Sequence, residues 1–242
     1  MTVLLLAGTG DAKRIAAGLA DANIKTIASL AGATRVPDTL PLPTRIGGFG
    51  GQAGFESYLA DNKISAVLDA THPFAEKITE RTAKVCAGLG MSYLYFLRPP
   101  WTQGDADNWT MIDREEDAAR HIPEAATVFL GTGRQTLAKF ANLEGRRVIC
   151  RQIDPPTAPF PFEGGEFLIG RPPFPVDREV ELFKALGIDW IVVKNAGGTA
   201  SRTKLDAAAK LAIPVLMIRR PPAPKAQTVD TVDAAVQWAK SL

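Results

Sequence analysis

The first half of the chain alternates between short continuous apolar runs and longer segments whose apolar residues recur at helical spacing. In the segment 11–22, for example, Ile15, Leu19 and Ala22 share one face of a helix. Continuous apolar runs are typical of parallel strands that helices cover on both sides. The predicted elements are strands 3–7, 24–30, 64–70 and 91–97, helices 11–22, 52–62 and 74–89, and a proline-rich connection at 35–46.

The second half repeats this order after a loop-rich stretch at 99–109 and a short polar helix at 113–122. We therefore predict the α/β class, with two Rossmann-like doubly wound domains, mainly parallel sheets and a cleft between them. The predicted domains are 1–110, which binds the cofactor, and 111–242, which binds the substrate. The remaining predicted elements are strands 127–130, 147–152, 167–169, 190–193 and 215–218 and helices 135–143, 176–186, 203–211 and 231–240, with a proline-rich loop at 154–162.

A Gly-Thr-Gly turn joins the first predicted strand of each half to the helix that follows it. Glycines at such a turn let the backbone approach a ligand, and the free N–H groups at the helix start attract phosphate. We expect the first turn, with Gly8, Thr9, Gly10 and Asp11, to bind a nucleotide cofactor. A helix cap by Thr9 without a ligand is the alternative.

The end of the second predicted strand indicates which dinucleotide is bound. NAD-binding units place an acidic residue about 20 positions beyond the glycines to accept from the ribose 2′-hydroxyl. No acid follows here, whereas Ser29, Thr34 and Arg35 can bind a 2′-phosphate. We therefore expect NADPH as the cofactor. The glycine-rich loop with Gly48, Phe49 and Gly50 is expected to pack against it, and a flexible lid is the alternative.

Composition narrows the class of protein further. The chain has 242 residues, 46% of them hydrophobic, and a net charge of +2, so we expect a globular protein that binds no nucleic acid. The absence of a long apolar run predicts a soluble, cytoplasmic protein without a membrane partner, present as a monomer or small homo-oligomer. Cys86 and Cys150 are the only cysteines and His72 and His121 the only histidines, so we expect no disulfide framework and no metal site.

One segment, Lys194–Lys225, is strongly basic, because Asp206 is its only acid. A solvated face with helix-end charges is one interpretation. A basic rim that attracts a polyanionic small molecule is the other.

The chain strongly resembles the precorrin-6A reductase family. The resemblance rests on Asp69–Ala75, on Arg45–Gly51 and on Arg98–Trp101, and it extends to Lys194–Gly198 with the segments around Lys204, Ile213–Val215 and Arg219–Pro221. It covers nearly the whole chain. The resemblance implies an enzyme of cobalamin biosynthesis that uses NADPH to reduce one double bond of precorrin-6A, a tetrapyrrole that carries several carboxylates.

The implied substrate gives several residues an expected role. His72 is the candidate proton donor, with loop orientation or a contact to cofactor phosphate as its alternatives. Asp69 is expected to hydrogen-bond loop amides, and Thr71 to contact the nicotinamide or pyrophosphate. The second turn, with Thr132, Gly133 and Arg134, binds a substrate carboxylate or is empty. The other expected substrate contacts, several of which have surface or helix-capping charges as the alternative, are Arg98, Arg171, Lys194, Asn195, Gly197, Gly198, Lys204, Arg219 and Arg220.

Two other classes of function remain open from the sequence. An S-adenosylmethionine-dependent methyltransferase also uses a glycine turn after its first strand, although its adenosyl ribose favours an acid after the second strand. A non-catalytic NADPH-binding regulatory module would bind the cofactor without turning over any tetrapyrrole.

Overall fold

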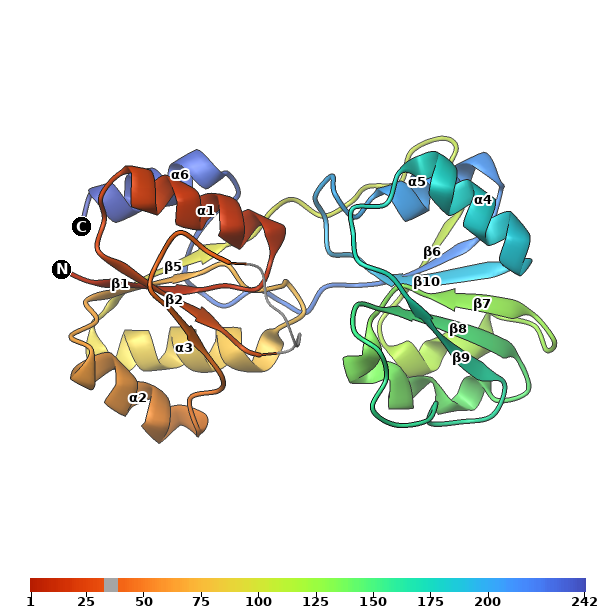
Figure 1. The fold of residues 1–242 in the computed structure, drawn as a ribbon, viewed down its shortest axis with the longest axis horizontal. Coiled ribbons are helices and arrows are strands. Elements are labelled where there is room, and N and C mark those ends of the chain that lie inside the picture. Colours follow the sequence, from red (N-terminus) through yellow and green to blue (C-terminus); the bar gives the residue numbers. More distant parts are fainter. Residues whose placement is uncertain (33–38) are drawn as a thin grey trace. The chain divides into compact units, whose positions relative to one another are not determined.

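The computed structural model describes residues 1–32 and 39–242, and these form two compact units. The first unit contains residues 1–99 and 221–242, and the second contains residues 100–220. Each unit is a parallel sheet with helices on both faces (Figure 1). The predicted α/β class with two Rossmann-like units is confirmed.

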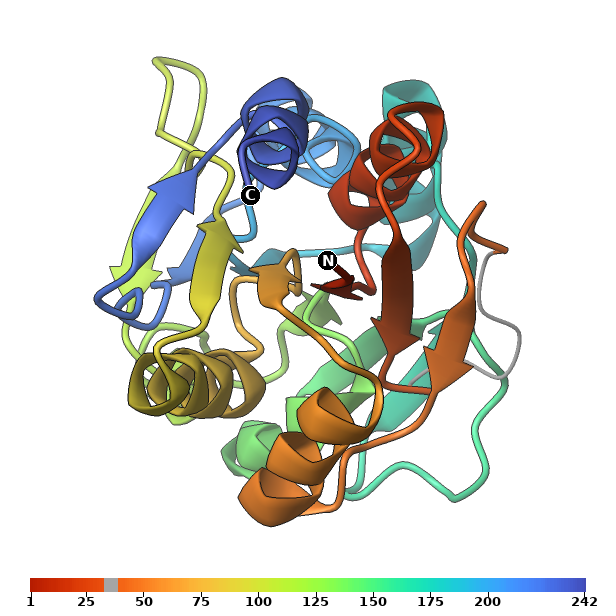
Figure 2. The ribbon, with the colours of Figure 1, turned by 90° about the vertical axis from the view of Figure 1, so that its left-hand side faces the viewer.

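The sheet of the first unit has the strand order β12-β5-β4-β1-β2-β3, and every neighbouring pair is parallel. Figure 2 shows this unit with β12 beside β5 and helices on both sides of the sheet. Its elements are β1 (Val3–Leu6), α1 (Gly10–Asp21), β2 (Thr26–Leu30), β3 (Thr44–Ile46), α2 (Gly51–Asp61), β4 (Ala66–Asp69), α3 (Glu76–Leu89), β5 (Ser92–Phe96), β12 (Gln227–Val229) and α6 (Val232–Lys240).

The continuous apolar run of β1 is explained by burial on both faces. Val3 and Leu5 pack with α1 and α6, while Leu4 and Leu6 pack with α2 and α3. All four side chains are at most 1% exposed. Burying each stabilises the folded state by about 1.5–3 kcal/mol, and successive residues of a strand point to opposite faces. The central strand therefore cannot alternate apolar with polar residues.

The second unit repeats this topology with the strand order β6-β11-β10-β7-β8-β9, again entirely parallel. Helices α4 and α5 cover one face, and two 3₁₀ segments, η1 and η2, pack against each other. Its elements are β6 (Trp109–Ile112), η1 (Glu115–Arg120), β7 (Thr127–Leu130), η2 (Arg134–Leu143), β8 (Arg147–Gln152), β9 (Gly165–Ile169), α4 (Val176–Leu186), β10 (Trp190–Lys194), α5 (Thr203–Lys210) and β11 (Val215–Ile218).

The two halves of the chain exchange their last strands. Strand β6 ends the first half but pairs with β11 in the second unit, and β12 ends the second half but pairs with β5 in the first. Helix α6 follows β12 and packs on α1. The structure thus differs from the predicted division 1–110 and 111–242, because residues 100–110 belong to the second unit and 221–242 to the first.

Three short strands and two helical segments also differ from the sequence predictions. The pattern gave no strand at β6 or β12, and it placed β3 in the proline-rich connection 35–46. Strands β3 and β12 are edge strands of three residues with largely solvent-facing side chains, so they carry little hydrophobic signal. The helices predicted at 113–122 and 135–143 are the 3₁₀ segments η1 and η2.

Candidate functional site

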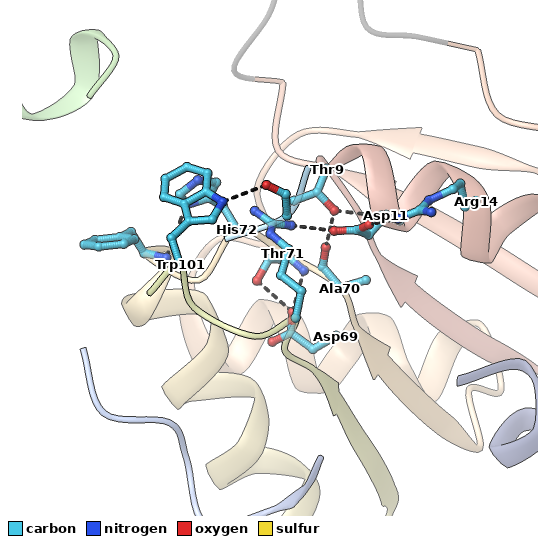
Figure 3. Close-up of polar contacts among 12 residues, drawn as sticks. Thr9, Asp11, Arg14, Asp69, Ala70, Thr71, His72 and Trp101 are labelled. Carbon is cyan, nitrogen blue, oxygen red and sulfur yellow. Dashed lines mark hydrogen bonds and ion pairs between the residues drawn. The ribbon is translucent and has the colours of Figure 1, made fainter. Parts of the chain in front are cut away.

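The first glycine turn is fixed by Thr9. Its Oγ1 accepts a hydrogen bond from the backbone N–H of Ala12 at 3.1 Å and donates to the carbonyl oxygen of Ala70 at 3.0 Å. Figure 3 shows Thr9 between the start of α1 and the segment that follows β4. Gly8 has φ +129°, which only glycine adopts readily, and an added Cβ at Gly8 or Gly10 would meet no atom within 4 Å. The turn therefore holds the start of α1 beside open space.

An ion cluster lies at the first turn of α1. Asp11 accepts from Nη1 of Arg98 at 2.7 Å and also from Nη2 of Arg14 (Figure 3). Burial by itself raises the pKa of the Asp11 carboxyl, but the hydrogen bonds from the two arginines bring that pKa below its usual value. Arg98, which follows β5, thus contacts the glycine turn, and its predicted contact with the substrate stays a prediction.

Asp69 is completely buried beneath the loop that follows β4. Its carboxylate accepts from the N–H of Thr71 at 3.0 Å, from Oγ1 of Thr71 at 2.7 Å and from the hydroxyl of Tyr93 at 3.0 Å. Burial raises the pKa of the Asp69 carboxyl, and it raises the pKa of the Tyr93 hydroxyl too. Oγ1 of Thr71 also lies 3.2 Å from Oγ1 of Thr79. Asp69 therefore shapes the loop, as the sequence analysis expected of its hydrogen bonding.

His72 follows directly on this anchored segment. Its Nδ1 accepts from the backbone N–H of Phe74 at 3.2 Å, and its carbonyl oxygen accepts from the N–H of Ala75 at 2.7 Å. Because Nδ1 is an acceptor here, the neutral imidazole carries its proton on Nε2. The ring is half-buried.

Arg45 joins the ends of β2 and β3 and was not among the predicted cofactor contacts. Its Nη1 donates to Oγ of Ser29 and to the carbonyl oxygen of Gly47, each at 2.8 Å, and its Nη2 donates to the carbonyl oxygen of Gly48 at 2.8 Å. The guanidinium carbon lies 4.1 Å from the ring centroid of Phe49. The sequence did contain a signal for Arg45 as a site residue, because Arg45 is the first residue of the Arg45–Gly51 motif on which the family resemblance rests.

The glycine-rich loop itself requires glycine at several positions. Gly47 and Gly50 have φ +122° and +73°. Gly50 also precedes the first residue of α2 as its cap. Two further residues predicted to bind the 2′-phosphate, Thr34 and Arg35, lie outside the described residues.

The second Gly-Thr-Gly turn is built differently from the first. A Cβ at Gly131 would lie 3.1 Å from Cγ1 of Val193 and 3.3 Å from Cδ of Lys204, so glycine is needed for close packing. The Thr132 hydroxyl is buried and has no hydrogen-bond partner among residues 1–32 and 39–242. Gly133 precedes η2 without a side-chain cap, and Arg134 next to it is exposed.

Lys194 lies at the end of β10 within a polar cluster. Its Nζ donates to Oγ1 of Thr136 at 3.1 Å and lies 3.6 Å from a carboxylate oxygen of Glu115. Burial lowers the pKa of the Lys194 amine, although Glu115 opposes this shift. Lys139 also lies 3.5 Å from Glu115. The Lys194 ammonium is therefore paired with Glu115, a carboxylate of its own unit.

Asn195 holds the backbone of Trp101, 94 positions away. Its Oδ1 accepts from the N–H of Trp101 at 2.8 Å and its Nδ2 donates to the carbonyl oxygen at 3.0 Å. The indole Nε1 then donates to the carbonyl oxygen of Gly198 at 2.7 Å. Arg220 donates through Nε to the carbonyl oxygen of Asn195 at 2.6 Å. Hydrogen bonds thus join Trp101, from the Arg98–Trp101 motif, to the Lys194–Gly198 motif.

Lys204 is the most strongly perturbed amine of the second unit. Burial lowers its pKa to about 8. Its Nζ donates to the carbonyl oxygen of Ser201 and lies 5.8 Å from the ring centroid of Trp101. A lysine of this kind switches its charge near neutral pH.

Much of the basic segment Lys194–Lys225 is paired with acids of the second unit. Arg202 contacts Asp107 at 3.0 Å, and Arg219 contacts Asp113 at 2.9 Å. For part of the segment, these ion pairs favour the interpretation that its basic residues form a solvated face with helix-end charges. Arg171, another predicted substrate contact, is exposed.

No helix among residues 1–32 and 39–242 is long and apolar enough to cross a membrane. Within the same residues, no group of histidine, cysteine, aspartate and glutamate side chains could hold a metal ion.

Two parallel α/β units, each with a glycine turn at the carboxyl edge of its sheet, define the Rossmann-like class of proteins. Within that class, the chain belongs to the family described as precorrin-6x reductase CbiJ/CobK, whose model matches residues 2–240. The solved structure of CobK precorrin-6A reductase superimposes with a TM-score of 0.95 at 39% identity, covering 100% of this chain and 96% of that one.

Curated relatives agree with this assignment. The precorrin-6A reductase of Rhodobacter capsulatus is 40% identical and covers 98% of this chain and 94% of its own length. That of Rhodococcus erythropolis is 41% identical, covering 99% and 98%. Relatives named cobalt-precorrin-6A reductase are more distant, as in Priestia megaterium with 26% identity over 90% of both chains.

Proposed function

We propose that this chain reduces one double bond of precorrin-6A with NADPH and forms precorrin-6B. Membership of the reductase family supports the reaction class. The observation that carries the cofactor assignment is the end of β2, where the Ser29 hydroxyl and the Arg45 guanidinium stand in place of an acid. A carboxylate there would repel a 2′-phosphate, whereas a guanidinium attracts one.

The first unit fits a dinucleotide in two further respects. Open space lies before Gly8 and Gly10, so a diphosphate can approach the backbone without a steric clash. The start of α1 provides amide N–H groups and the positive end of a helix dipole. Asp11 would oppose an anion at this place, but Arg98 and Arg14 neutralise it.

When bound, the reduced nicotinamide supplies two electrons and one hydrogen to the macrocycle, and one proton from another donor completes saturation of the double bond. In the proposal, the imidazolium form of His72 donates that proton from Nε2 and becomes neutral. Two features support this role: the loop is anchored by Asp69, and an unperturbed imidazole gains and loses a proton near neutral pH. Because Asp69 and Thr71 satisfy each other's polar groups, their part is to fix the loop.

The second unit is proposed to bind the substrate carboxylates. Lys194, Lys204, Arg171, Arg219 and Arg220 remain its candidate cations, and the turn at Thr132 and Gly133 offers backbone amides. The metal-free macrocycle is the proposed substrate, since relatives at 40% and 41% identity carry the name precorrin-6A reductase while the cobalt-named relative shares 26%.

Anaerobic incubation of the purified chain with NADPH tests the proposal, with metal-free precorrin-6A in one arm and cobalt-precorrin-6A in the other. We expect NADPH oxidation matched by a change in macrocycle absorbance in the metal-free arm. Nucleotide binding without turnover in either arm would favour the regulatory module instead. Faster turnover in the cobalt arm would reverse the assignment of the substrate.

The role of His72 is tested by replacing it with glutamine, and His121 provides a matched control because it is the other histidine and is exposed. His72→Gln should lower kcat by about 10²-fold or more, while His121→Gln leaves it unchanged. Equal turnover of the two variants would remove His72 from proton transfer.

A further inference from the structure

Two polar side chains of the second unit are buried at the carboxyl edge of its sheet without a partner. Gln152 is the last residue of β8 and is 7% exposed. Among residues 1–32 and 39–242, neither Nε2 nor Oε1 of its amide has a hydrogen-bond partner, and the same holds for the buried hydroxyl of Thr132, just after β7. Buried polar groups are nearly always paired, so these three atoms are available to a ligand.

Strand register places the two side chains next to each other. Leu130 of β7 pairs with Cys150 of β8, and Thr132 and Gln152 each follow two residues later along the same two neighbouring strands. The carbonyl oxygen of Gln152 accepts from the N–H of Gly170 at 3.0 Å, so the backbone at this position is held in the sheet. Neighbouring strands lie about 4.8 Å apart, and one small group can therefore contact both side chains.

The residue before each of these side chains faces the side of the sheet that α4 and α5 cover. An added Cβ at Gly131 would meet Cδ of Lys204, on α5, at 3.3 Å. Arg151 pairs with Glu179 of α4. Successive residues of a strand point to opposite faces, so the hydroxyl and the amide both lie on the face away from α4 and α5.

The charges near the start of η2 favour an anion. Lys194 lies at the end of β10, the other neighbour of β7, and it donates to Thr136 of η2 and pairs with Glu115. Lys139 of η2 pairs with the same carboxylate. Two ammonium groups thus lie against one carboxylate, and the excess positive charge attracts a negative ligand to this part of the edge.

A carboxylate has the hydrogen-bonding groups that this place requires. The amide of Gln152 carries two N–H donors and the hydroxyl of Thr132 carries one O–H donor, while an ionised carboxyl group only accepts. The amide oxygen would repel the same group, so the amide must present Nε2 to it. Ligands of doubly wound sheets bind outside the carboxyl ends of the strands, which is where both side chains lie.

We propose that the amide of Gln152 and the hydroxyl of Thr132 form an uncharged subsite that binds one carboxylate arm of the macrocycle and so helps to fix its orientation on the second unit. The inference rests on the proposed function and deepens it, because Gln152 is neither a cation nor part of a glycine turn. Lysines and arginines attract any polyanion over a distance, whereas a hydrogen bond to a buried amide requires one position of the arm. Gln152 is therefore a specificity-determining residue.

Gln152→Met tests the assignment with two measurements, because methionine has nearly the same length but lacks the amide. In steady-state kinetics, KM for precorrin-6A should rise about tenfold, which is about 1.4 kcal/mol. KM for NADPH and kcat should stay within about twofold of the wild type, as expected for a loss of substrate binding alone. In urea denaturation without ligand, the variant should be at least as stable as the wild type, because an unsatisfied buried amide is removed.

A purely structural glutamine would give the opposite pair of results. Lower stability of Gln152→Met with an unchanged KM for precorrin-6A would therefore overturn the subsite. Gln237→Met is the matched control, because Gln237 is exposed on α6 of the first unit, and it should behave like the wild type in both measurements. An equal rise of KM in the two variants would also count against the subsite.

Three further variants test the chemistry of the pair. Gln152→Glu keeps the shape but turns the donor into an anionic oxygen, so it should raise KM for precorrin-6A more than Gln152→Met does. Thr132→Val removes the hydroxyl and should raise the same KM, and Thr132→Ser should restore most of the affinity. A glutamate variant that binds precorrin-6A as well as the wild type would refute a carboxylate as the ligand.

Equilibrium binding separates this inference from the proposed function. Quenching of tryptophan fluorescence measures the Kd of precorrin-6A without NADPH, and Gln152→Met should raise it by the same factor as KM. A wild type that binds and reduces precorrin-6A, beside a variant with unchanged Kd, would reject the subsite alone. A variant that raises KM for NADPH instead would assign the pair to the cofactor and likewise reject it. A wild type that does not reduce precorrin-6A would reject the proposed function itself.

Discussion

Thr9 connects the glycine turn to the strand beside it, and its removal gives the sharpest test of the first unit. Valine has nearly the same shape but lacks the hydroxyl, so Thr9→Val removes the cap on the N–H of Ala12 and the bond to the carbonyl oxygen of Ala70. Loss of an N-cap costs about 1 kcal/mol. A buried carbonyl left without its partner costs about 1 kcal/mol more.

Urea denaturation should therefore show a free energy of unfolding about 2 kcal/mol lower for Thr9→Val than for the wild type. Thr9→Ser keeps the hydroxyl and is the control, with an expected loss below about 0.5 kcal/mol. The dissociation constant of NADP⁺ should also rise in Thr9→Val, because the turn loosens where the diphosphate is proposed to bind. If the valine and serine variants were equally stable, the attribution of this rigidity to Thr9 would be wrong.

Three other predictions concern charged groups. Arg151 and Glu179 form a buried ion pair whose side chains are 8% and 1% exposed, so Glu179→Ala should lower the free energy of unfolding by about 3–5 kcal/mol. Glu166→Ala is the control, because Glu166 belongs to an exposed pair with Arg147, and it should lower the same free energy by less than about 1 kcal/mol. Equal losses for the two variants in urea titrations would contradict this prediction. The pKa of Asp11 is lower in the folded state, so its contribution to stability is present above the unfolded value near 3.8 and fades as the pH falls below it; unfolding of Asp11→Asn at several pH values should differ least from wild type in acid. The Lys204 amine should titrate near pH 8 when followed by NMR. Because its folded pKa is lowered, the stability of the wild type relative to Lys204→Met should rise as the pH increases above 8. A titration midpoint of Lys204 near 10.5 would refute the effect of burial.

Local sequence patterns were sufficient for most of the framework of both units. The central strands are buried on both faces and so appear as continuous apolar runs, and the amphipathic helices have one buried face. The first turn was also predictable, because a glycine at Gly8 and a capping residue at Thr9 act within a few positions of each other. The hydrogen bonds of Asp69 to Thr71 span only two positions and were expected for the same reason.

Other parts of the candidate site depend on pairs that are distant in sequence. Arg98 reaches Asp11 across 87 positions, and Asn195 reaches Trp101 across 94. Sequence analysis identified these residues by type and assigned several of them to the substrate. Their side chains contact distant parts of the same unit, which no local pattern could reveal.

The sequence by itself determined that this protein has two parallel α/β units with glycine turns, because burial on both faces and turn chemistry act over a few neighbouring residues. Only the tertiary structure decided which sheet each edge strand joins, because β6 and β12 pair with strands that are more than 100 positions away in the sequence. It also decided that Thr132 and Gln152 come together at the carboxyl edge of the second sheet. That meeting depends on strand register and helix packing, which follow from the free energy of the whole fold rather than from any segment.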